Sequence, residues 1–111
     1  MPDARADLLQ GTLDMLVLTT LTLEPMHGWG ISVRLRQISG DVFDVQQGSL
    51  YPALQRMLRR GWLTSEWRDT ENNRRARYYA ITREGRRQLE AQAAEWDRSS
   101  RAVDRVLRFA T

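Results

Sequence analysis

A mainly helical fold with one small β-hairpin is predicted by three features of this 111-residue sequence. Apolar residues recur at intervals of three and four over the first 60 residues, which is the period of a helix with one buried face. Strand-like alternation then flanks a polar turn near residue 70, as in a hairpin. From residue 82 the helical period returns. The length fits one compact domain.

Two helices are expected before residue 40. Leucines at helical spacing make residues 8–23 a largely buried central helix. Glu24 and Pro25 should end it, because proline has no amide donor and restricts the residue before it. A second helix should span residues 27–38 and close at Gly40. Its inward residues are Ile31, Leu35 and Ile38.

A third helix is expected over residues 47–60 and ends at Gly61. The preceding segment, 41–45, alternates over too few residues for more than a turn or one minimal strand. The third helix has an apolar stripe formed by Leu50, Leu54, Met57 and Leu58. Its opposite, polar side carries Ser49, Pro52, Gln55, Arg56 and Arg59.

The hairpin and a last helix complete the chain. Residues 63–68 and 75–81 read as paired strands, and the polar segment between them as an exposed basic turn. Thr82 is a natural N-cap for a helix that continues to about residue 109. A heptad seam runs along that helix through Leu89, Ala93, Trp96, Ser100, Val103, Leu107 and Ala110.

Three helices followed by a hairpin are the plan of the winged helix-turn-helix. In that plan the third helix enters the major groove of DNA, and the hairpin, or wing, lies along the backbone. We therefore expect a winged-helix DNA-binding domain over residues 1–81, followed by a long C-terminal helix over residues 82–111.

Positive charge is concentrated on the elements that this plan turns toward DNA. The chain carries 17 basic residues, all of them arginine, against 14 acidic ones. Residues 56–87 hold ten arginines and four carboxylates, a net charge of +6, which leaves −3 for the rest of the chain. A DNA backbone requires such a cationic surface. The alternative for the third helix is an ordinary solvated face.

Candidate DNA contacts follow from this distribution. Arg74 and Arg75 at the hairpin tip are assigned to phosphates. On the third helix, Ser49, Tyr51 and Gln55 can donate to phosphates or base edges, and Arg56 and Arg59 can reach either. Tyr51 is equally well explained as a half-buried packing residue. The full candidate set is Ser49, Tyr51, Pro52, Gln55, Arg56, Arg59, Arg74, Arg75 and Arg77. A winged-helix module that binds an acidic protein partner is the alternative function.

No catalytic or metal-binding constellation is expected, and therefore no enzyme and no cofactor. The chain has no cysteine, and His27 is its one histidine. Asp41 and Asp44 are interpreted as turn and cap residues. Neither a signal peptide nor an apolar stretch of roughly 20 residues is visible, so we expect a cytoplasmic protein without a membrane segment.

Trp96 has two interpretations. On the seam, between the small residues Ala93 and Ser100, it can be an aromatic knob of a dimer interface. It can also be a platform on which a flat aromatic effector stacks between subunits. The residues of this interface or pocket are Leu89, Ala93, Trp96, Ser100, Val103 and Leu107.

Several separated motifs resemble those of PadR-family transcriptional regulators, specifically the shorter subgroup with a single C-terminal helix. They are Gln10-Gly11-Thr12-Leu13, His27-Gly28-Trp29-Gly30-Ile31, Gly48-Ser49-Leu50-Tyr51-Pro52-Ala53-Leu54, Gly61-Trp62-Leu63 and Arg74-Arg75-Ala76-Arg77-Tyr78-Tyr79. The resemblance implies a homodimeric bacterial repressor in which residues 82–111 form the dimerisation helix. It also implies binding to a palindromic DNA operator and, as in some relatives, a response to an aromatic compound. Two departures are Arg77 in place of the family's common lysine and Asn72-Asn73 in place of a glycine-containing wing tip.

Overall fold

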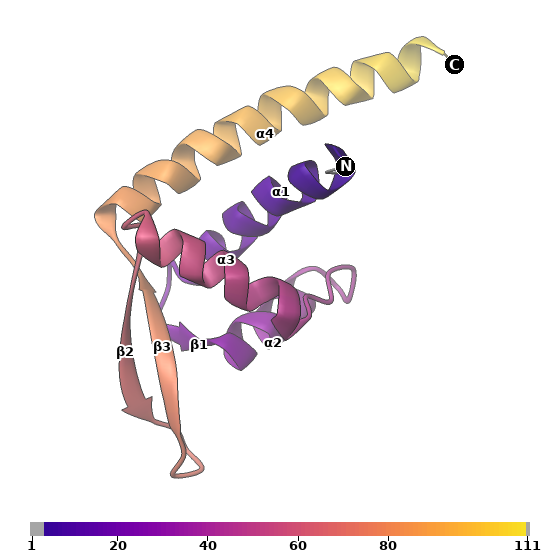
Figure 1. Cartoon of the computed structure of the whole chain (residues 1–111). Helices are drawn as coiled ribbons and strands as arrows, with labels where there is room; N and C mark the ends of the chain where they lie inside the picture. The colour runs from indigo at the N-terminus through magenta and orange to yellow at the C-terminus, as the bar shows by residue number, and fades with distance from the viewer. Residues whose placement is uncertain (1–3, 111) are drawn as a thin grey trace.

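A computed structural model describes the backbone of residues 4–110 and the side chains of residues 11–110 (Figure 1). Within these residues the chain forms four α-helices and one three-stranded antiparallel sheet, which confirms the mainly helical fold with a hairpin wing. The elements are α1 (Ala4–Thr20), β1 (Met26–His27), α2 (Gly28–Ile38), α3 (Gln47–Arg59), β2 (Leu63–Asp69), β3 (Arg75–Ile81) and α4 (Arg83–Phe109).

The core lies where the first three helices meet the base of the hairpin. Leu18 of α1, Ile31 of α2 and Leu54 of α3 are fully buried, and Tyr79 joins them from β3. The predicted stripe of α3 is confirmed for Leu50, Leu54 and Met57, and Leu58 packs at its margin. Because this stripe is buried, α3 must present its other side outward.

The sheet has the order β1–β3–β2, and its first strand was not predicted. Met26 and His27 pair with Tyr79 and Tyr78 of β3. A strand of two residues is too short to show alternation in a sequence, so only the pairing reveals it. The predicted hairpin is confirmed, with Leu63 opposite Ile81 and Trp67 opposite Arg77.

Three details of the first two helices were predicted wrongly. α1 begins at Ala4 rather than near residue 8 and ends at Thr20 rather than near residue 23. At this end the Thr20 hydroxyl donates to the Val17 carbonyl and the Thr22 hydroxyl to the Thr19 carbonyl, and such side-chain bonds compete with a regular helix. Ile38 is 67% exposed rather than inward, because it ends α2 beyond the part that the core covers.

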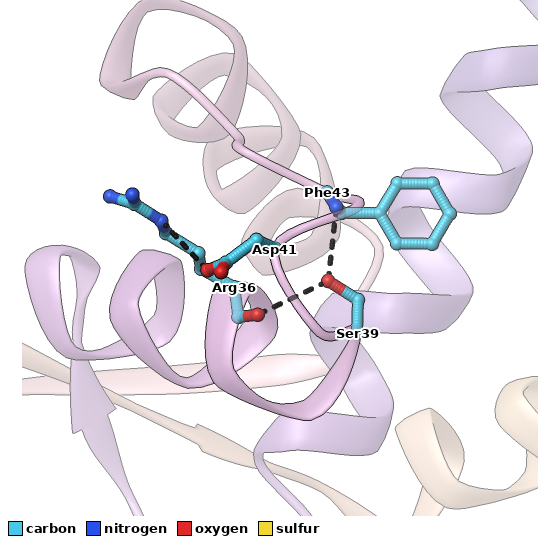
Figure 2. Close-up of polar contacts among 4 residues, drawn as sticks. All are labelled: Arg36, Ser39, Asp41 and Phe43. Atoms are coloured by element: carbon cyan, nitrogen blue, oxygen red, sulfur yellow. Dashed lines mark hydrogen bonds and ion pairs between the residues drawn. The ribbon is translucent and has the colours of Figure 1, made fainter.

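The turn between α2 and α3 is held by its own polar contacts (Figure 2). The Ser39 hydroxyl donates to the Arg36 carbonyl and accepts from the Phe43 amide at 2.9 Å, and Arg36 Nε donates to Asp41 at 3.2 Å. Gly40 and Asp41 both have positive φ, which glycine and aspartate tolerate better than most residues. Asp41 is thus a turn residue, as expected, and residues 41–45 form no strand.

α4 starts at the base of the hairpin and runs alongside α1 toward the C-terminus (Figure 1). Its N-cap is Thr82, as predicted, whose hydroxyl accepts from the Gly85 amide at 3.0 Å. Gly85 is buried against the Trp62 carbonyl, and Leu89 packs against the core. From Glu90 onward most of α4 is exposed.

Candidate nucleic-acid interface

A groove of about 640 Å³ lies between α3 and the wing. One wall carries Tyr51 and Gln55 of α3, and the other carries Arg75 and Arg77 of β3. Further lining comes from His27, Gly28, Trp29, Trp67, Thr70, Asn72, Arg74, Ala76 and Tyr79. The third helix and the arginine-bearing hairpin therefore face one common space, as the winged-helix plan requires.

The α3 wall follows from the helical period. Tyr51 is 47% exposed and Gln55 is partly buried, on the flank of α3 that turns from the core toward the wing. The Tyr51 hydroxyl lies beside Gly28 at the start of α2, where an added Cβ would stand 3.3 Å from it. Tyr51 is thus a half-buried packing residue, the second of the two interpretations, because its hydroxyl end packs beside Gly28 while about half of its side chain stays exposed.

Ser49, Pro52 and Arg59 are exposed on α3 and do not line the groove. Pro52 sits in the second turn of α3 without breaking the helix. At the N-terminal end of α3 the side-chain Nε2 of Gln47 donates to the Ser32 hydroxyl of α2 at 2.7 Å. This bond helps to fix the angle between the two helices.

The wing wall follows from the two-residue period of a strand. Leu63 and Tyr79, on one face of the hairpin, enter the core at its base. Farther out, the same face carries Trp67 and Arg77, which are too far from the helices to be covered and so line the groove. Trp67 is 59% exposed.

The wing tip is a tight turn. The Thr70 carbonyl accepts from the Asn73 amide at 3.0 Å, and Asn73 has a φ of 58°. Asparagine tolerates this left-handed conformation better than most residues other than glycine. Asn73 therefore takes the place that a glycine would fill at the tip.

The expectation that Arg56 lies on the exposed side of α3 is wrong. Its side chain is only 18% exposed, and its Nη2 forms an ion pair with Asp14 of α1, which is 7% exposed. Burial raises the pKa of Asp14, and the hydrogen bond and charge of Arg56 oppose that rise. With its guanidinium bound to Asp14, Arg56 joins α3 to α1 instead of facing the groove.

The remaining arginines near the interface differ in what they contact. Arg68 is paired with Glu66 and lies over the Tyr78 ring on the other face of the wing, and Arg60 lies over the Trp62 ring. Arg77 is bound to Ser65. Within the described part of the chain, the guanidinium groups of Arg59, Arg74 and Arg75 form no hydrogen bond or ion pair, and the one side-chain contact of Arg74 is from its backbone amide to the Thr70 hydroxyl. These three are the arginines most available to phosphates.

Trp29 and Trp67 are groove residues that the sequence analysis missed. Both are exposed and line the groove. The signal in the sequence was that Trp67 lies near the outer end of a predicted strand whose first residue, Leu63, is the one that enters the core.

Tyr79 forms part of the groove lining, and burial raises the pKa of its hydroxyl, which keeps the group protonated.

His27 has a structural role at the start of α2. Its Nδ1 accepts from the Gly30 amide at 3.0 Å, and its ring packs edge-on against Tyr78.

No cluster of three or more metal-ligating side chains exists among the residues that the structure describes. Over those same residues, no helix combines the length and apolarity that a membrane span needs.

A second groove, of about 600 Å³, separates α1 from α4. Trp96, Ser100 and Val103 of the predicted seam line it, opposite Thr12 and Met15 of α1. Ala93 and Leu107 are exposed elsewhere on α4, and Leu89 packs against the core. Glu95 and Asp104 also line this groove, and the Arg98 guanidinium lowers the pKa of Glu95, which keeps that carboxylate charged.

Comparisons with known proteins agree with this geometry. The sequence model of the transcriptional regulator PadR-like family matches residues 17–91. A PadR family transcriptional regulator from Eggerthella lenta is 32% identical, with 92% of this chain and 87% of that chain covered and a TM-score of 0.78. A PadR-like transcriptional regulator from Bacillus cereus is 28% identical (91% and 96% covered, TM-score 0.76). A transcriptional regulator from Clostridium thermocellum is 25% identical (89% and 96% covered, TM-score 0.81).

Proposed function

The chain belongs to the PadR-like family of transcriptional regulators, and from this premise we propose that it is a homodimeric repressor released from its operator by a small aromatic effector. The proposal places it in the cytoplasm and gives it no catalytic role. One observation carries it: α3 and the arginines of the wing border the same groove. A surface of this shape and charge suits a DNA duplex.

In the proposed complex, α3 enters the major groove and the wing follows the adjacent backbone. Arg59, Arg74 and Arg75 contact phosphates, because their guanidinium groups are exposed and without a partner among the described residues. Gln55 and Tyr51, which line the groove between helix and wing, face the base edges. Two copies place their α3 helices in successive major grooves, about 34 Å apart, on a palindromic site.

Replacing Arg74 and Arg75 together with alanine is expected to weaken binding to every duplex alike. Affinity falls with salt, and each phosphate contact contributes about 0.9 to the steepness of log affinity against log salt concentration. Losing two contacts should therefore make this plot shallower by about 1.8. Gln55→Ala should instead change the preferred bases and leave the slope unchanged, because Gln55 carries no charge. The measurements are a salt series on a mixed-sequence duplex and selection from a random duplex pool.

Arg56→Met is the matched control for this experiment. Since Arg56 is bound to Asp14, its replacement should lower the melting temperature and leave the selected sequence unchanged. Equal effects of the Arg74/Arg75 and Gln55 changes would contradict the division of roles. A wild-type protein that ignores duplex DNA at low salt but binds an acidic protein would contradict the proposed function itself.

The dimer is proposed on the exposed apolar surface of α4. Val103, Val106 and Leu107 are between 55% and 70% exposed in the single chain. Soluble proteins rarely leave such a surface uncovered. A second α4 presents the same residues, so the two helices can bury them against each other around a two-fold axis.

The effector is proposed to bind in the groove between α1 and α4, with its ring on Trp96. Glu95 at this groove is paired with Arg98, so Asp104 supplies its net negative charge and favours a planar cation over a phenolic anion. A cationic planar dye is expected to change tryptophan emission and weaken DNA binding, and a phenolic acid to do so less. Trp96→Ala should remove the response, while Phe43→Ala, which changes an exposed aromatic residue that lines neither this groove nor the groove between α3 and the wing, should retain it. A response that survives in Trp96→Ala would place the effector elsewhere.

A further inference from the structure

Arg77 differs from the other wing arginines because a side chain of the neighbouring strand holds it. Its Nε donates to the Ser65 hydroxyl at 2.8 Å, across the β2–β3 pair. Both residues are partly buried and both lie on the groove face of the hairpin. Arg74 and Arg75, by contrast, are exposed at the tip with no such bond.

The position of Arg77 places it at the junction of helix and wing. It stands two residues from Tyr79, which is in the core, and opposite Trp67, and it shares the groove with Gln55 of α3. Its two terminal nitrogens form no hydrogen bond or ion pair within the described residues. The bond to Ser65 therefore uses one edge of the guanidinium and leaves the other edge for a ligand.

We infer that Ser65 is a positioning residue: its hydroxyl orients the Arg77 guanidinium to bind one backbone phosphate at the junction of α3 and the wing. The inference rests on the proposed DNA-binding function and extends it. A guanidinium presents two parallel donors to a phosphate, and fixing its plane beforehand lowers the ordering cost of binding. A lysine ammonium has no plane to fix, so the Ser65 bond has this effect only with arginine at position 77.

The test is a double-mutant cycle on the full chain with a mixed-sequence duplex as the probe. Arg77→Gln should weaken binding about tenfold. It should also make the plot of log affinity against log salt concentration shallower by about 0.9, the value for one phosphate. Ser65→Ala should weaken binding about fivefold with an unchanged slope, because the charge remains while its geometry is lost. In the Arg77→Gln background, Ser65→Ala should have no further effect.

Two control variants separate positioning from general damage to the wing. Ser65→Thr keeps the hydroxyl and should restore wild-type affinity. Thr64→Ala removes a hydroxyl from the adjacent, exposed position on the opposite face of β2 and should change nothing. Melting temperatures of all variants should remain near that of the wild type, since a structural defect would lower them.

Wild-type affinity in Ser65→Ala would overturn the inference and leave the proposed function intact. The same would follow if Ser65→Ala caused an equal loss in the Arg77→Gln background. A wild-type protein that does not bind the duplex would overturn the proposed function and the inference together.

Discussion

Gly85→Ala is expected to destabilise the protein by about 3 kcal/mol, at the upper end of the range for overpacked sites. A Cβ on Gly85 would lie 2.2 Å from the Trp62 carbonyl oxygen and 2.8 Å from Cγ1 of Ile81. The carbonyl cannot move freely, because it accepts the Thr82 amide at the start of α4. Thermal unfolding followed by circular dichroism should show a melting temperature lower by roughly 10–20 °C.

Gly48→Ala is the matched control, because it adds the same methyl group to a helix without a clash. Nothing lies within 4 Å of the position that its Cβ would occupy. Alanine is the better helix former, so this variant should gain about 0.5 kcal/mol. A melting temperature of Gly85→Ala within a few degrees of the wild type would show that α4 can move away from Trp62, contrary to the close packing described above.

Val103→Asp combined with Leu107→Asp is expected to produce a monomer that has lost most of its affinity for DNA. In the proposed dimer both side chains are buried against the second α4, where paired carboxylates would be desolvated and would repel each other. A monomer can occupy only one half-site, and the loss of the second should weaken binding by about 10²–10⁴-fold. Sedimentation and duplex binding measure the two effects.

Arg105→Asp provides the control for charge. It lowers the net charge by two, as the double variant does, and lies on the opposite side of α4 from positions 103 and 107. It should stay dimeric, and its DNA affinity should be close to that of the wild type. Two results would contradict the proposed dimer. One is a wild-type protein that sediments as a monomer at micromolar concentration, and the other is a double variant that remains dimeric.

Elements whose signals are local were predicted well. Three such predictions were confirmed: the apolar stripe of α3, the alternation of β2 and β3, and the N-cap at Thr82. Each depends on residues only a few positions apart in the sequence. The surface that these elements create was predictable for the same reason. Once Leu50 and Leu54 are buried, Tyr51 and Gln55 must lie on the flank of α3.

Contacts between distant parts of the chain were missed. Arg56 has an exposed position in a helical pattern, and only the crossing of α1 and α3 brings Asp14 to it. β1 is a strand because β3 lies beside it, not because of its own two residues. Arg77 is held because the register places Ser65 within reach of its Nε.

The amino-acid order by itself determined the succession of the four helices and the hairpin, which sides of them are apolar, and which segment concentrates the arginines, because each of these depends on near neighbours along the chain. Only the tertiary structure decided how each arginine can meet a phosphate, since that depends on its partner across the fold. Asp14 binds Arg56 away from the groove, Ser65 orients Arg77, and Arg75 has no side-chain partner among the described residues. A side chain's charge is a property of the residue, but its availability is a property of its surroundings.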